Sequence, residues 1–135
     1  MNSPSTAEYQ ARLARFYSLQ QQELHPACTV KPASTEDVSR LVQIFDKRQC
    51  VFAVASGGHM SWKGSSNIDG GVLLDLRGLN RIEVAANTGT ASLGPGATWK
   101  EVYGAMAPLN VSATGARLND VGVAGFLLGG MCLFS

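Results

Sequence analysis

Two glycines followed directly by a histidine form the first pattern in this chain that could do chemistry. They stand in the stretch Ser56 to Met60 (SGGHM), which a single alanine separates from the short apolar run Phe52 to Val54. A glycine-rich loop at the end of a strand exposes backbone N–H groups with no side chains in front of them, and such a nest binds anions, phosphate above all. From the residues alone, this phosphate-binding interpretation and a simple tight turn are equally supported.

The histidine of this loop, His59, is ambiguous by itself, because a lone histidine is more often a hydrogen-bonded structural residue than a ligand or a nucleophile. The only other histidine is His25, and neither is surrounded by the carboxylates of a metal site. The three cysteines also lack the spacing of a zinc site, so we expect no metal. No GxSxG motif of a serine hydrolase, no Walker loop and no GxGxxG dinucleotide fingerprint is present.

Composition and charge exclude several classes of protein. The chain has 135 residues, 45% of them hydrophobic and 16% charged, which is typical of one globular domain with a core of its own. The net charge is +1 and the basic residues are scattered, so we expect neither a nucleic-acid surface nor a basic membrane patch. No apolar run approaches the roughly 20 residues of a membrane span. The N-terminus lacks the apolar core of a signal peptide.

Glycine is unusually frequent, with 15 residues in 135, against a typical share of about 7%. The excess falls in short clusters between apolar runs, which mark sharp turns or places where the backbone approaches something closely. The clusters lie at 57 and 58, 70 and 71, 94 and 96, 122 and 125, and 129 and 130.

The elements that position these clusters are expected to alternate between helix and strand, an α+β (alternating α/β) fold class. Turn formers, capping residues and hydrophobic periodicity predict their places. We expect helices over 8–22, from 34 or 35 to about 48, and over 98–107; strands over 28–34, 51–54, 71–76 and 110–114; and a hairpin of 81–85 with 90–94.

Four stretches in one order resemble the FAD-linked oxidases of the vanillyl-alcohol-oxidase or p-cresol-methylhydroxylase (PCMH) type, and among these the fungal relatives of berberine bridge enzyme. The stretch FAVASGGHMSWKGSSNIDGGVLLDLRGLN resembles the flavin-attachment segment of that family. The others are CTVKPASTEDVSRLV, ASLGPGATWKEVY and TGARLNDVGVAGFLLGG, so the likeness covers nearly the whole chain. One motif alone would be weak support, whereas four in register strongly support membership.

The resemblance implies a role for each matching residue, with FAD as the cofactor. The loop residues Ser56, Gly57, Gly58 and Met60 would hold the FAD pyrophosphate through backbone N–H groups, in agreement with the nest. His59 would bond covalently to the 8α-methyl group of the flavin ring, since an imidazole nitrogen is a competent nucleophile. Gly94 and Gly96 would form a turn that supports the cofactor pocket. The backbone that lines the flavin and its ribityl chain would come from Gly115, Val121, Gly122 and Gly125.

The resemblance also implies a domain organisation. Residues 1–25 form an N-terminal helical segment, and residues 26–135 form a partial PCMH-type FAD-binding domain, with its N-terminal subdomain and the start of the second subdomain. The implied function is an FAD-binding oxidoreductase of the oxidase type, or the N-terminal FAD-binding part of one. A small-molecule substrate would be bound only in the full-length enzyme, so we name no catalytic residue. Full-length relatives can be secreted, and no compartment is assigned.

Three positions depart from the family pattern. Ala55 stands where many members have a basic residue, and Leu118 stands where members with two covalent flavin bonds have a cysteine. A single bond through His59 is therefore the most that we expect. Met131 replaces a usual third glycine.

The length suggests a truncated chain. We therefore expect Leu127, Leu128, Leu133 and Phe134 to be exposed and the chain to be marginally stable without oxidase turnover. Two alternatives remain beside the oxidoreductase. One is an inactive fragment with weak or no FAD binding, and the other is a phosphate-binding α/β domain unrelated to flavin.

Overall fold

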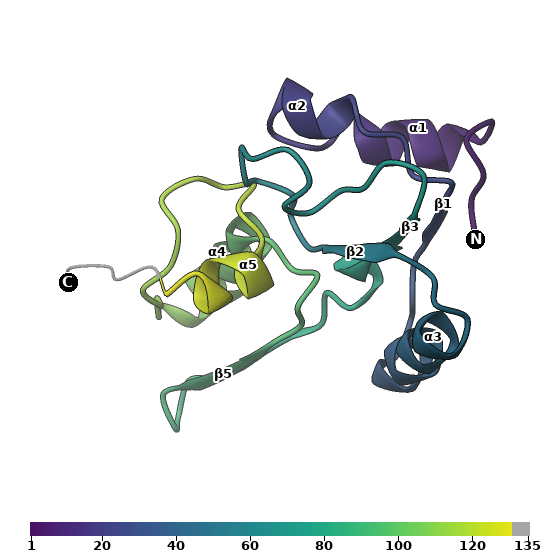
Figure 1. Ribbon diagram of the computed structural model, residues 1–135. Helices are drawn as coiled ribbons and strands as arrows, with labels where there is room; N and C mark the ends of the chain where they lie inside the picture. Colours follow the sequence, from purple (N-terminus) through teal and green to yellow (C-terminus); the bar gives the residue numbers. More distant parts are fainter. Residues whose placement is uncertain (131–135) are drawn as a thin grey trace.

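A small parallel sheet and a separate hairpin carry the helices of this protein, as a computed structural model of residues 1–130 describes it (Figure 1). The sheet consists of β1 (Cys28–Val30), β3 (Val72–Asp75) and β2 (Phe52–Ala55), and the hairpin of β4 (Ile82–Ala85) and β5 (Thr90–Leu93). The helices are α1 (Ala7–Leu13), α2 (Leu19–Gln22), α3 (Thr35–Lys47), α4 (Trp99–Met106) and α5 (Val123–Leu128), with 3₁₀ turns at Leu76–Gly78 and Ala107–Leu109. The expected mixture of helices and strands is confirmed.

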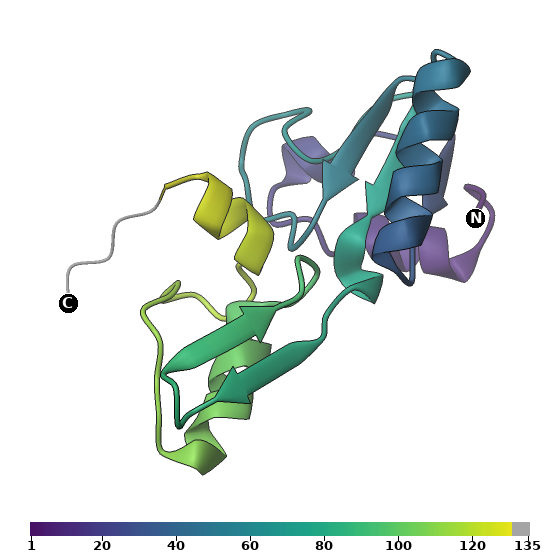
Figure 2. The same ribbon diagram turned by 90° about the horizontal axis from the view of Figure 1, so that it is seen from below.

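The last of the three sheet strands along the chain lies in the middle of the sheet. Both β1 and β2 pair in parallel with β3, so that Val72 faces Cys28 on one side and Phe52 on the other. Its residues Leu73 and Leu74 are almost fully buried, as expected for a strand covered on both faces. Figures 1 and 2 show α1 on one face of this sheet and α3 on the other.

The helix α1 is held on the sheet by an apolar cluster. Tyr9, Leu13 and Phe16 from the N-terminal segment pack with Ala55 of β2 and Leu73 of β3. Each large side chain buried in this way contributes about 1.5–3 kcal/mol. Residues before position 26 therefore share a core with the strand that leads into the SGGHM loop.

The helix α3 begins and ends where the sequence predicts. Its capping box joins Ser34 and Asp37: the Asp37 backbone N–H donates to the Ser34 hydroxyl at 3.1 Å, and the Asp37 carboxylate accepts from the Ser34 N–H at 3.2 Å. This exchange satisfies two of the N–H groups that a helix start leaves free. At the other end, Gln49 takes a left-handed φ of 52° and ends the helix.

A second apolar cluster surrounds Trp99 at the start of α4. Its buried members come from α4, α5 and the connecting segments, and β4 and β5 pack against it with Ile82, Val84 and Leu93. The Glu101 carboxylate accepts from the Thr98 backbone N–H at 2.7 Å, which caps α4 as its sequence predicts. Among residues 1–130, no helix is long and apolar enough to cross a membrane.

Two expected elements differ in the structure. The helix over 8–22 is divided into α1 and α2, because Ser18 accepts a hydrogen bond from the Gln21 N–H and starts a new helix there. Residues 110–114 form no strand. Val111 and Ala113 do alternate toward the Trp99 cluster, but their backbone has no neighbouring strand to pair with among the described residues.

Candidate functional site

The loop that follows β2 presents a row of unused backbone donors. Among residues 1–130, none of the N–H groups of residues 57 to 61 donates a hydrogen bond to another residue. Gly58 in this loop has a φ of 76°, a conformation that costs a residue with a Cβ about 1–2 kcal/mol. The loop therefore has both the free donors and the glycine conformation of an anion nest.

His59 lies in the same loop, half-buried, with its ring stacked on Tyr17. The two ring centroids are 4.1 Å apart and the planes are inclined by 16°. Neither ring nitrogen of His59 makes a hydrogen bond to another residue in the described part of the chain. Within residues 1–130, no group of three or more His, Cys, Asp or Glu side chains could hold a metal ion.

The SGGHM loop is in backbone contact with the glycine segment that precedes α5. A Cβ added to Gly57 would overlap the backbone nitrogen of Gly122, and a Cβ added to Gly122 would overlap that of Gly57. The Ser56 hydroxyl donates to the Pro95 carbonyl at 2.6 Å, which ties the loop to the turn between Gly94 and Gly96. Three glycine clusters that lie far apart in the sequence therefore meet at one place.

Gly94 and Gly96 let the turn pack closely on the segment after β3. A Cβ on Gly94 would overlap the Leu79 carbonyl, and one on Gly96 would overlap the Leu76 carbonyl. The Pro95 carbonyl, which lies between the two glycines, accepts the hydrogen bond from Ser56. The close packing of this turn therefore fixes its place next to the loop. The turn thus lies beside the loop, and its role in supporting the cofactor stays a prediction.

The remaining expected site residues occupy different surroundings. A Cβ on Gly115 would overlap the Trp99 ring, so the need for glycine there arises from packing in the Trp99 cluster. Val121 is partly buried, and its carbonyl accepts a hydrogen bond from the backbone N–H of Trp99 at 3.0 Å. Gly125 is exposed on α5 with no atom within 4 Å of an added Cβ, and Met60 is half-exposed. Gly115 is thus set apart from the Gly57–Gly122 contact.

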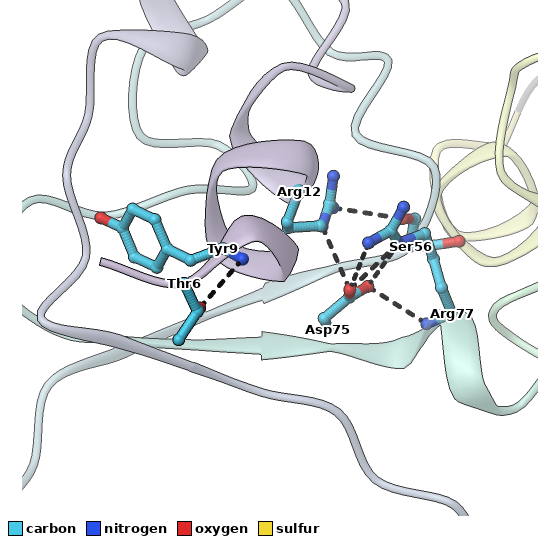
Figure 3. A network of polar contacts seen from close by, with 6 residues as sticks. All are labelled: Thr6, Tyr9, Arg12, Ser56, Asp75 and Arg77. Atoms are coloured by element: carbon cyan, nitrogen blue, oxygen red, sulfur yellow. Dashed lines mark hydrogen bonds and ion pairs between the residues drawn. The ribbon is translucent and has the colours of Figure 1, made fainter. Parts of the chain in front are cut away.

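Buried charges lie behind the loop (Figure 3). Arg12 of α1 is 1% exposed, and its Nε is 3.4 Å from the Asp75 carboxylate, which also binds Arg77 at 2.8 Å. The Arg12 Nη2 donates to the Ser56 carbonyl at 3.4 Å. Burial lowers the pKa of Arg12 to about 10 against the opposing effect of Asp75, so the guanidinium stays charged at pH 7. Asp75 itself ends β3 and is only 4% exposed, so its carboxylate is buried with the guanidinium of Arg12.

Sequence reasoning missed the contacts that the N-terminal segment makes with this loop. Besides Arg12, the Tyr17 backbone N–H donates to the Gly58 carbonyl and the Ser18 hydroxyl to the Ser61 carbonyl. A signal for Arg12 exists, because it stands at helical spacing with the apolar Tyr9, Leu13 and Phe16 on one face. A charged residue on the apolar face of a helix needs a buried partner of opposite charge. The position of Arg12 therefore predicts a buried ion pair at the place where this helix packs.

The departures from the family pattern can be placed in part. Ala55 is fully buried against α1, and Leu118 is exposed in the segment before Gly122. Leu127 and Leu128 are 61% and 90% exposed, as expected from the sequence. Met131, Leu133 and Phe134 lie outside the described residues.

Similar proteins support the assignment that these motifs suggest. A family model described as "FAD binding domain" matches residues 26–133. FAD-dependent monooxygenase tpcD of Cochliobolus heterostrophus is 37% identical over 127 residues, covering 94% of this chain and 24% of that protein. The chain thus spans about a quarter of the length of such relatives.

Two solved structures have the same fold over most of this chain. The BBE-like 1 protein of Physcomitrella patens has a TM-score of 0.79 and 26% identity over 92% of this chain and 27% of its own. The glucooligosaccharide oxidase of Acremonium strictum has a TM-score of 0.77 and 24% identity over 93% of this chain and 26% of its own. They confirm the fold predicted from the motifs, while the matched domain and the FAD-dependent relatives support FAD as the cofactor. The chain belongs to the FAD-binding domain family, with the fold of the PCMH-type oxidoreductases and FAD as its cofactor.

Proposed function

We propose that the chain holds FAD through the loop from Ser56 to Met60, as the cofactor-binding part of an FAD-dependent oxidoreductase. One observation carries the proposal: the N–H groups of residues 57 to 61 donate to no other residue of the described chain. An N–H group without a partner costs free energy when water is excluded, and the phosphate oxygens of FAD would satisfy several at once. Glycines at 57 and 122 let the two backbones come into contact, and glycine at 58 leaves room for the Phe16 ring behind the loop.

We further propose that His59 attaches the flavin covalently. Its ring lies in the same loop, stacked on Tyr17, and both of its nitrogens are free of hydrogen bonds to the described residues. The glucooligosaccharide oxidase of similar fold is described as carrying a 6-S-cysteinyl, 8α-N1-histidyl FAD. Here Leu118 offers no thiolate at the position suggested for the cysteine, so the bond through His59 is the only one that we propose.

The bond would join an imidazole nitrogen of His59 to the 8α carbon of the flavin. His59 would supply the nitrogen and give up its N–H proton, and the flavin would supply the carbon and lose one proton from its methyl group. The flavin, with O2 as the final acceptor, would supply the two-electron oxidation that this bond requires, and O2 would become hydrogen peroxide. Tyr17 keeps the imidazole in one plane, which lowers the entropy lost when the ring is aligned for attack.

The role of this chain in the reaction is to hold and orient the cofactor. Bound flavin supplies hydride acceptance from a small-molecule substrate. The loop and the glycine turn at Gly94 and Gly96 fix the cofactor, and the backbone near Gly122 excludes water from it.

A second candidate is a fragment with weak FAD affinity and no turnover. The exposure of Leu127 and Leu128 favours it, since each large apolar side chain left in water forgoes about 1.5–3 kcal/mol. The two candidates differ in whether the isolated chain retains FAD at micromolar concentration.

The visible spectrum of the purified protein, taken before and after acid precipitation, tests the proposed function. The wild-type pellet is expected to stay yellow, whereas His59→Ala should release its flavin to the supernatant. His25→Ala is the matched control, because His25 lies outside the loop, and its pellet should remain yellow. A yellow pellet from His59→Ala would disprove covalent attachment through His59. A wild type that takes up no FAD would disprove the proposed FAD binding and favour the second candidate, the fragment with weak or no FAD binding.

A further inference from the structure

We infer that three residues of the N-terminal segment belong to the cofactor site as positioning residues. They are Arg12, Tyr17 and Ser18, and their contacts orient the phosphate-binding loop. These residues precede position 26, where the matched domain begins. The inference rests on the proposed function of the loop. It assigns to the N-terminal segment a role in ligand binding besides its packing on the sheet.

Three donors of this segment bind carbonyl groups of the loop or of Ser61, the residue that directly follows it. The Arg12 guanidinium donates to the Ser56 carbonyl at 3.4 Å, and the Tyr17 backbone N–H donates to the Gly58 carbonyl at 3.1 Å. The Ser18 hydroxyl donates to the Ser61 carbonyl at 3.0 Å. The carbonyl groups of Ser56, of Gly58 and of Ser61 just after the loop therefore all face the N-terminal segment.

These contacts determine where the N–H groups of the loop point. A trans peptide is planar, and its C=O and N–H point in opposite directions. The described chain has no cis peptide bond. Since the Ser56 carbonyl faces Arg12, the Gly57 N–H faces the opposite side. By the same geometry the Gly58 carbonyl directs the His59 N–H away from the segment. The contacts with the N-terminal segment thus fix the direction of the N–H groups that are proposed to hold phosphate.

Arg12 also supplies charge on that rear side. Its guanidinium lies 4.2 Å from the centre of the Phe16 ring, and its Nη1 has no hydrogen-bond partner among the described residues. The Asp75 carboxylate is shared between Arg12 and Arg77, so two positive groups face one negative group. One positive charge therefore remains uncompensated behind the loop, where the low dielectric of the interior strengthens its attraction for an anion.

Ligands with and without phosphate separate positioning from a purely structural role. We would compare Arg12→Met with the wild type for binding of ADP, which carries a pyrophosphate, and of riboflavin, which carries none. The matched control is Arg15→Met, an exposed arginine of the same segment. For Arg12→Met we expect the dissociation constant of ADP to rise at least tenfold and that of riboflavin to change less than twofold. Arg15→Met should change neither by more than twofold.

The backbone orientation has its own readout in the amide resonances of residues 57 to 61. ADP should shift these resonances in the wild type, and at equal occupancy the shifts should be smaller in Arg12→Met because the peptides are no longer held. Should Arg12→Met not fold, Arg12→Lys retains the charge but cannot reach Ser56 and Asp75 together, and we expect it to weaken ADP binding about threefold or more.

Two results would overturn the inference while leaving the proposed function intact. One is a folded Arg12→Met, or a folded Arg12→Lys in its place, that binds ADP as tightly as the wild type. The other is an equal loss of ADP and riboflavin affinity, which would assign Arg12 a structural role. A wild type that binds neither FAD nor ADP would overturn the proposed function itself, and with it the ligand that Arg12 is inferred to position.

Discussion

Gly58 is the residue at which the loop, the N-terminal segment and the backbone conformation can be tested together. Its φ of 76° is left-handed, so Gly58→Ala places a Cβ in a conformation that costs about 1–2 kcal/mol. The added Cβ would also lie 2.7 Å from Cδ1 of the Phe16 ring, which is almost fully buried. Overpacking of this kind costs about 1–3 kcal/mol, so we expect a total loss of about 2–5 kcal/mol in the free energy of unfolding.

A glycine a few residues later separates the two contributions. Gly64 has a similar φ of 80° but no atom within 4 Å of an added Cβ. Gly64→Ala should therefore lose only the conformational part, about 1–2 kcal/mol. The difference between the two variants, about 1–3 kcal/mol, measures the contact with Phe16.

Urea unfolding followed by circular dichroism gives both free energies, and a fluorescence titration gives the affinity for FAD. Gly58→Ala should also weaken FAD binding more than tenfold, because Phe16 must shift and Arg12 lies 3.5 Å from the same added atom. Gly64→Ala should bind FAD as the wild type does. Equal stability losses in the two variants, or an unchanged FAD affinity in Gly58→Ala, would refute the reasoning.

Two further predictions concern the buried charges and α5. Asp75→Asn should lower the free energy of unfolding by about 3–5 kcal/mol, because it removes the counter-ion of a buried guanidinium. Glu83→Gln is its control and should cost less than about 1 kcal/mol, since Glu83 pairs with Arg81 in solvent. If urea unfolding gave similar stability losses for Asp75→Asn and Glu83→Gln, the proposed effect of burial would be contradicted. Gly125→Ala should raise stability by up to about 1 kcal/mol, as its methyl group meets no atom, while weakening FAD binding. An unchanged FAD affinity would remove Gly125 from the proposed flavin lining.

Much of the fold follows from local sequence signals. The boundaries of α3 and α4 depend on short-range contacts, such as the exchange between Ser34 and Asp37, which the sequence displays directly. The residues around 110–114 show why such signals fail elsewhere. Alternation predicts which side chains turn inward, but a strand also needs a neighbour, and no local pattern contains that information.

The site divides in the same way. The glycines of the loop were identified because a close approach of two backbones requires them, and Gly57 with Gly122 is such a contact. Gly115 carries the same sequence signal for another reason, its packing against Trp99. Arg12 and Asp75 escaped prediction because their pairing joins positions far apart in the chain, and burial of a charge is decided by the tertiary contact alone.

The order of strands in the sheet has a consequence for synthesis on the ribosome. Because β3 is central, neither β1 nor β2 has a neighbouring strand of the sheet to pair with until residues 72–75 have left the exit tunnel. Asp75, the last residue of β3, is also the counter-ion of Arg12. Until it emerges, the nascent chain lacks the carboxylate that compensates Arg12 in the folded structure, so premature burial of the apolar face of α1 against other apolar segments is disfavoured. Completion of the sheet and docking of the N-terminal helix should then occur as one cooperative event.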